Sequence, residues 1–261
     1  MKFDFGVKGA AAATVISQGL SALFCIVYFF IKNPVAKLTS DDMRFNKNIL
    51  IKCMATGIPI AAQNGLISVS MVALQSVTNS FGGAVMTAYT VSMRIEQFVQ
   101  QPFSSLGAAE ATFTGQNIGA GKNDRAVEGL RASIKLSSGF AVAVMIVFLL
   151  FGRNLAGFFV SGERSIDIAA KALMITSVFY VPLGSIHTVR GFLNGCGDTG
   201  YAIVNGMAEV ITRIGLSLIL TRISFIDFWG IWITTAATWV VTALVSLLRY
   251  KGGKWKTKSK I

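Results

Sequence analysis

The sequence predicts an all-α polytopic membrane protein, and three observations lead to this class. Of its 261 residues, 53% are hydrophobic and only 14% are charged, whereas soluble domains carry about 25% charged residues. The mean hydropathy is +0.61. Seven apolar segments also approach or exceed the length of about 20 residues that a membrane-spanning helix needs. They are approximately residues 9–31, 51–77, 84–113, 133–151, 168–193, 202–220 and 228–248.

The first two segments lie on either side of a basic connection. Residues 1–8 lead into the first apolar run without a cleavage pattern, so we expect this run to stay in the membrane. The second segment contains Gly57-Ile58-Pro59 and then the adjacent amides Gln63 and Asn64. These amides suit contact with a solute or a cation and, equally, the clamping of a neighbouring helix.

The third segment is the most polar of the seven, and we expect it to be broken. Its polar residues include Arg94, Glu96, Gln97, Gln100, Gln101 and Glu110. Ionisable side chains are costly inside a bilayer and usually face a bundle interior or a wet cavity. We therefore predict that these residues border a solute pathway. Arg94 and Glu96 point in different directions on a helix, so they need partners elsewhere, with Glu209 and Arg213 as candidates.

The later segments contribute an ion pair, the only histidine and a proline. Glu209 and Arg213 are four residues apart and share a helical face; they form either a structural pair or a protonatable gate. His187 suits a proton relay near neutral pH or a simple hydrogen bond. Pro59, Pro102 and Pro182 fall inside predicted spans and are expected to kink them, as a packing feature or as flexible cavity-lining helices.

The charges are distributed as in a membrane protein rather than a nucleic-acid-binding protein. The formal net charge is +12, but the basic residues gather between the apolar spans. Alternate connections carry 15 and 6 Lys and Arg residues, and the richer side is expected to be cytoplasmic. This places the C-terminus inside the cell, with residues 249–261 as a basic tail facing anionic lipid. We expect no nucleic-acid partner.

A weak internal repeat explains the odd number of spans. When Gly6 is aligned with Gly230, Ala12, Ala13 and Thr14 match Ala236, Ala237 and Thr238; chance similarity of two Ala/Thr-rich helices is the alternative. The repeat divides the chain into four parts. They are residues 1–31 as the last helix of a preceding lobe, 32–52 as a cytoplasmic linker, 53–248 as a six-helix lobe and 249–261 as the tail. The earlier helices of the first lobe would then be missing from this chain.

No residue set predicts an enzyme, a metal site or a cofactor. Cys25, Cys53 and Cys196 are isolated from one another, so we expect neither a disulfide nor a zinc site. Gly121-Lys122 lacks the first glycine and the Ser or Thr of a phosphate-binding loop. Ser-His-Asp, HExxH and paired-carboxylate arrangements are likewise absent from the sequence.

Two longer motifs resemble the multidrug and toxic compound extrusion (MATE) family. Residues 107–122, GAAEATFTGQNIGAGK, are similar to its Gly-Gln-x-x-Gly-Ala-Gly helix end, and residues 190–199, RGFLNGCGDT, to its Arg-Gly…Gly-Asp-Thr turn. The resemblance implies twelve helices in two lobes, of which this chain supplies helices six to twelve. It also implies a multi-pass plasma-membrane antiporter that exports organic, often cationic, compounds by alternating access, driven by Na⁺ or H⁺.

The chain departs from the family pattern at its coupling residues. Some members use a Glu in helix seven and an Asp in helix ten, but residues 51–77 and 168–189 contain no carboxylate. Others use an Asp in helix one, which this chain lacks. We therefore expect that the chain alone does not transport. Two alternatives are a lipid-linked oligosaccharide flippase of related architecture and a non-transporting membrane fragment.

Overall fold

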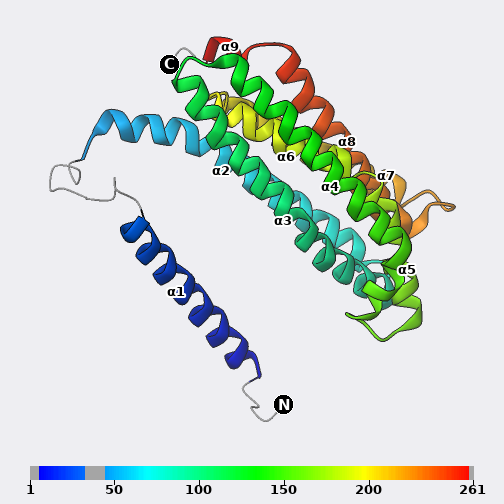
Figure 1. Cartoon of the computed structure of the whole chain (residues 1–261). Coiled ribbons are helices and arrows are strands. Elements are labelled where there is room, and N and C mark those ends of the chain that lie inside the picture. The colour runs from blue at the N-terminus through cyan, green and yellow to red at the C-terminus, as the bar shows by residue number, and fades with distance from the viewer. Residues whose placement is uncertain (1–5, 33–44, 259–261) are drawn as a thin grey trace. The chain divides into compact units, whose positions relative to one another are not determined.

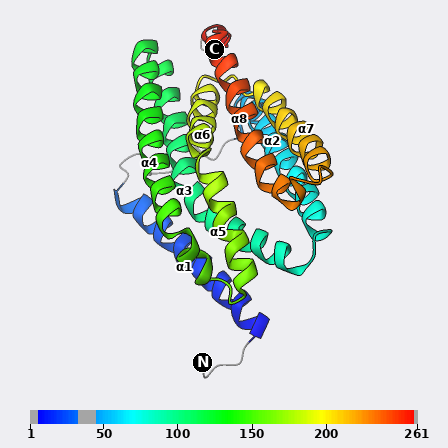
Figure 2. The ribbon, with the colours of Figure 1, turned by 90° about the vertical axis from the view of Figure 1, so that its right-hand side faces the viewer.

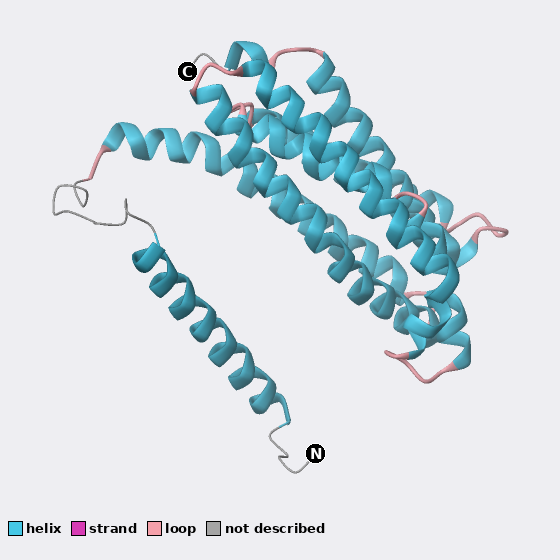
Figure 3. Cartoon of the chain, viewed as in Figure 1, coloured by secondary structure: helices cyan, strands magenta, loops and turns pink. Residues whose placement is uncertain are grey.

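The computed structural model describes residues 6–32 and 45–258, and in these ranges the regular structure is entirely helical (Figures 1 and 3). The chain divides into two units, Met1–Ile51 and Lys52–Ile261. In the first unit, α1 (Gly6–Lys32) contains the predicted span 9–31. Its side chains are exposed wherever they are described, as expected of an apolar helix seen without lipid. The all-helical membrane class predicted from composition is confirmed.

The second unit is a bundle of long antiparallel helices. Its elements are α2 (Lys47–Asn79, starting just before the unit boundary), α3 (Gly83–Gly119), α4 (Asn123–Gly157), α5 (Glu163–Ser177), α6 (Tyr180–Gly195), α7 (Gly200–Leu220), the short η2 (Asp227–Trp229), α8 (Gly230–Lys251) and α9 (Trp255–Lys258). In Figure 2, α6 lies between α3 and α8, in agreement with its contacts to α3, α4 and α8. We call the end carrying the α3–α4 and α6–α7 turns and α9 the basic end.

The predicted break is in the fifth span and not in the third. The third segment is one continuous helix of 37 residues that passes through Pro102. The fifth is bent by 54° between α5 and α6. Pro182 has no N–H to donate to the carbonyl of Val178, the residue where α5 is capped. Pro59 also lies inside an unbroken helix, α2, so only the expectation at Pro182 coincides with a measured bend.

Six of the seven predicted spans coincide with helices that are long and apolar enough to cross a membrane. Five are single helices, and the bent α5–α6 pair makes the sixth. The remaining one, α3, is not among them because its polar residues lower its hydropathy. The helices also extend beyond the predicted spans, so that the connection expected over residues 114–132 shrinks to the turn between Gly119 and Asn123.

Glycines bring α3 and α6 unusually close together. A Cβ atom added to Gly191 would lie 2.2 Å from the carbonyl oxygen of Gly107, and one added to Gly195 would lie 2.5 Å from that of Ala111. Small residues four apart on a membrane helix allow two backbones to approach in this way. His187 lies at the same crossing, where its ring stacks on Phe103 with centroids 6.5 Å apart. The α3–α6 contact is thus the most tightly constrained part of the bundle.

The two family-like motifs form the turns of the basic end. At the first turn Gly121 has φ +72°, and the N–H of Lys122 donates to the carbonyl of Asn117 at 2.8 Å. At the second, Gly197 has φ +76°, and the N–H of Asp198 donates to Leu193 at 2.9 Å. Both are helix-ending turns in which glycine takes the left-handed conformation. The backbone geometry of these two turns therefore explains why glycine occurs in both motifs.

Candidate functional site

The structure separates the predicted site residues into two groups. Gln63, Glu96, Glu110, Glu209 and Arg213 are buried inside the bundle. In contrast, Asn64, Arg94 and Gln97 are exposed, and Gln100 is half-buried. The predicted site is therefore not one cluster: some residues hold the helices together, and others lie on the outside of the bundle.

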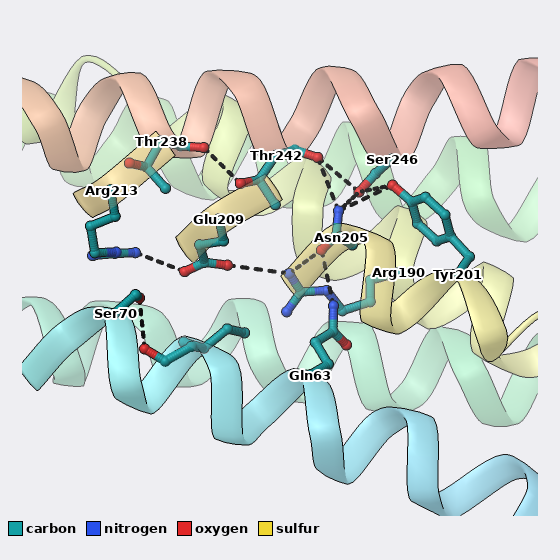
Figure 4. A network of polar contacts seen from close by, with 11 residues as sticks. Gln63, Ser70, Arg190, Tyr201, Asn205, Glu209, Arg213, Thr238, Thr242 and Ser246 are labelled. Carbon is teal, nitrogen blue, oxygen red and sulfur yellow. Dashed lines mark hydrogen bonds and ion pairs between the residues drawn. The ribbon is translucent and has the colours of Figure 1, made fainter. Parts of the chain in front are cut away.

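A network of buried amides and hydroxyls centres on Asn205 of α7, which is fully buried (Figure 4). Its Oδ1 accepts hydrogen bonds from Gln63 Nε2 at 2.9 Å and from Arg190 at 2.6 Å. Its Nδ2 donates to Ser246 Oγ at 2.9 Å and to the Tyr201 hydroxyl at 3.1 Å. One amide thus joins α2, α6, α7 and α8.

An ion-pair chain continues from this amide along α7 (Figure 4). Arg213 donates to Glu209 Oε1 at 2.7 Å, so the pair expected from the four-residue spacing is present. Arg190 of α6 approaches the other carboxylate oxygen at 3.7 Å. All three side chains are largely buried, and the Nε atoms of both arginines lack a hydrogen-bond partner among the described residues. A buried carboxylate between two guanidiniums stays favourable only while all three remain in place.

The expectation that Arg94 and Glu96 find partners on other helices is only partly met. Arg94 forms no ion pair with any described residue and points outward from α3. Glu96 faces the interior, where it interacts with the Thr176 hydroxyl through a hydrogen bond and with the positive charge of Arg213 through electrostatic attraction. Arg94 and Glu96 are two residues apart on α3, so their side chains lie on different faces of this helix. The suggestion that both would pair with Glu209 or Arg213 is wrong for Arg94.

The hydrogen bonds of Glu110 join two helices. Its Oε1 accepts from Thr114 at 2.8 Å and its Oε2 accepts from Ser133 of α4 at 2.5 Å. Both oxygens are satisfied, and the bonds tie α3 to α4. Near the basic end, Arg249 clamps Asp198 with two bonds of 2.7 Å and so holds the end of α8 to the α6–α7 turn. These carboxylates hold neighbouring helices together.

The exposed face of α3 is largely polar, although Met86 and Phe98 on this helix are also exposed. Residues at steps of three or four share this face and are exposed: Thr90, Arg94, Gln97, Gln101, Ser105, Ala108, Thr112 and Gln116. We call these residues the α3 stripe. The exposed side of α4 is different, since it presents Val142, Ile146 and Leu150. Lipid suits the α4 face but not a row of amides and hydroxyls.

A family model described as MatE matches residues 59–219, from the proline of α2 to the end of α7. The chain belongs to the MatE family. The resemblance inferred from the two turn motifs is thereby confirmed, and the matched residues include the α3 stripe and the members of the Asn205 network on α2, α6 and α7.

The relatives and solved structures that this MatE chain matches are longer proteins. It is 26% identical over 257 residues to the probable multidrug resistance protein YoeA of Bacillus subtilis, covering 97% of this chain and 55% of that relative. For the probable multidrug resistance protein NorM of Thermotoga maritima the values are 24% over 262 residues, 99% and 56%. A crystal structure of MATE in complex with MaL6 has the same fold, with a TM-score of 0.87 at 23% identity over 99% of this chain and 58% of that one. The chain spans about half the length of the curated relatives it matches.

The sequence-based reasoning missed the centre of the MatE network. Asn205, Arg190 and Tyr201 were not among the candidates, although Asn205 lies one helical turn before Glu209, at the spacing that revealed the Glu209–Arg213 pair. A second signal was on α8, where Thr234, Thr238, Thr242 and Ser246 recur every four residues and are all buried. Following four-residue steps of polar residues would have located both sides of the α7–α8 contact.

Replacing Asn205 by Leu should loosen the bundle. The change leaves Gln63, Arg190 and Tyr201 without their shared partner, and each buried polar group left unpaired costs about 1 kcal/mol or more. We expect the unfolding free energy to fall by about 2 kcal/mol, measured by unfolding the purified protein in detergent. Asn154→Leu, at an exposed position near the end of α4, is the control and should change stability little. Equal stability of the two variants would contradict a structural role for the network.

Proposed function

We propose that this chain forms one lobe of a multidrug exporter and supplies about half of the wall of a solute passage. The observation that carries the proposal is the α3 stripe, a polar face on a helix whose neighbours are apolar. In a bilayer such a face is stable only against water or against another protein surface. The names of the multidrug resistance relatives, and the fact that the chain spans about half their length, support this reading.

The buried network gives this lobe the rigidity that alternating access requires. The Asn205 amide and the Glu209 ion pairs lock α2, α6, α7 and α8 together, so the lobe moves as one body. The α3 stripe then lies on the moving wall, where its amides meet a solute. Outside these locked helices, the 54° bend between α5 and α6 is the place where the lobe can flex.

Transport would be driven by H⁺ or Na⁺ exchange for an organic, cationic compound at the plasma membrane. The coupling ion must bind one conformation more tightly than the other, because a ligand shifts a conformational equilibrium only through differential affinity. We place the basic end in the cytoplasm, following the charge asymmetry, and the basic tail against lipid. Residues 1–31 would then complete the preceding lobe.

A flippase of lipid-linked oligosaccharides is the less favoured reading. Such a substrate carries phosphates, which call for several basic side chains along the passage. Arg94 is the only charged residue of the α3 stripe, and two further arginines within the spans, Arg190 and Arg213, are engaged with Glu209. The polar but nearly uncharged stripe fits a drug passage better.

Reconstitution tests the proposal. We expect liposomes containing this chain alone to show no efflux of the cationic dye ethidium under either a proton or a sodium gradient, because half of the passage wall is absent. The same chain joined to the first half of a MatE relative should export the dye, and the joined protein with Gln101→Leu on the α3 stripe should export it at a reduced rate. Ion-driven efflux by the chain alone would refute the half-wall account.

A further inference from the structure

Glu96 is a buried carboxyl group with an unfilled hydrogen-bonding position. It lies on α3 with 4% of its surface exposed, in a core that also contains Tyr89, Tyr180 and Trp232. Its Oε1 atom has no hydrogen-bond partner among the described residues. An ionised carboxylate in apolar surroundings is costly unless it is fully paired, so the neighbours of this group decide its state.

The neighbouring groups are already committed to other partners. The Thr176 hydroxyl of α5 is a hydrogen-bonding neighbour of Glu96 and also donates to the carbonyl of Ala172 at 3.2 Å. The positive charge of Arg213 on α7 also attracts the Glu96 carboxylate, yet Arg213 Nη2 donates to Glu209. Tyr89 on α3 and Tyr180 on α6 are the other titratable groups that interact with it, and the Tyr180 hydroxyl is itself unpartnered.

Glu110 provides an internal comparison on the same helix. It is equally buried at 2% exposure, but each of its oxygens accepts a hydrogen bond from a hydroxyl, at 2.8 and 2.5 Å. A carboxylate with both oxygens satisfied can remain ionised inside a protein. Glu96 lacks this support on Oε1.

We propose that Glu96 is a proton-binding site, a neutral carboxylic acid in this conformation that can release its proton to water. A sodium ion suits the position poorly, because no second carboxylate among the described residues acts on Glu96. The described residues contain no group of three or more His, Cys, Asp and Glu that could hold a metal.

That proton release from Glu96 drives export rests on the proposed function; the protonation itself does not.

Infrared difference spectroscopy of the 261-residue chain in lipid nanodiscs tests the site directly. Spectra recorded at acidic and alkaline pH should differ by the carbonyl stretch of a buried, protonated carboxylic acid. We expect Glu96→Gln to abolish this band, Glu96→Asp to retain a shifted one, and Glu110→Gln to leave it unchanged. Because Gln has the shape of the neutral acid, the variant should fold, and circular dichroism verifies this.

The result that overturns the proposal is equally clear. A titrating band that persists in Glu96→Gln, or the absence of such a band in the wild-type chain across the pH range in which it stays folded, would show that Glu96 does not hold an exchangeable proton. Loss of the band in Glu110→Gln but not in Glu96→Gln would show that the exchangeable proton is on Glu110 and not on Glu96. None of these readouts depends on transport, so failure of the export proposal would leave them intact.

Discussion

Gly191→Ala is expected to prevent the bundle from packing, although it adds a single methyl group. The new Cβ would lie 2.2 Å from the carbonyl oxygen and 3.0 Å from the carbonyl carbon of Gly107, both backbone atoms. Backbone cannot move aside as a flexible side chain does, so α3 and α6 must separate. We expect a loss of about 3 kcal/mol or more, at the upper end of overpacking effects.

A matched alanine on α4 controls for helix propensity. Gly139 is exposed and has nothing within 4 Å of an added Cβ, so Gly139→Ala should be neutral or stabilising by up to about 1 kcal/mol, the propensity gain of alanine over glycine. Thermal unfolding of both variants in the same detergent, followed by size-exclusion chromatography, measures the difference. Similar melting of Gly191→Ala and wild type would mean that α3 and α6 do not approach as described.

Glu209→Ala should be the most damaging change in the polar network. Arg213 is 2% exposed and Arg190 is also largely enclosed, so removal of the shared carboxylate leaves two buried positive charges without a counterion. Breaking a buried pair on one side costs on the order of 3–5 kcal/mol. The unfolding free energy in detergent should fall by that amount, together with the yield of folded protein.

Two further variants separate a lost ion pair from a lost side chain. Glu163→Ala removes the exposed partner of Arg153 near the opposite end of the bundle and should change stability little, as is usual for surface pairs. The double variant Glu209→Leu with Arg213→Leu removes both members of the closer pair and should recover part of the loss, since apolar replacements avoid an unpaired charge. If Glu209→Ala lowered the unfolding free energy as little as Glu163→Ala, the buried ion pair would not contribute to stability.

The sequence predicted most of the fold because membrane helices reveal themselves in local composition. Six spans coincide with long apolar helices, and the glycines of the two motifs lie at left-handed turns. The position of the break was wrong because proline acts in context. Pro182 lies in the first turn of α6, four residues after the cap of α5, whereas Pro102 lies in the middle of a helix that packs against α4, α5 and α6, and neighbouring helices can compensate for one missing hydrogen bond.

The site was predicted only in part because burial is a tertiary property. Gln63 and Asn64 are adjacent amides that sequence analysis treated alike, yet Gln63 is buried against Asn205 and Asn64 is exposed. The Glu209–Arg213 pair was predictable because both residues are on one helix. The convergence of four helices on Asn205 was not, since it depends on how those helices pack and not on their spacing along the chain.

Cysteine accessibility in membranes tests the central claim, that the α3 stripe borders an aqueous passage, most directly. Cys25, Cys53 and Cys196 would first be replaced by Ala, and single cysteines placed at Gln97, Gln101 or Ala108 on the stripe and at Val142 or Ile146 on α4. The account predicts that a water-soluble thiol reagent labels the stripe positions and leaves the α4 positions unlabelled. Equal labelling of the two helices, or a stripe as unreactive as the α4 positions, would contradict it.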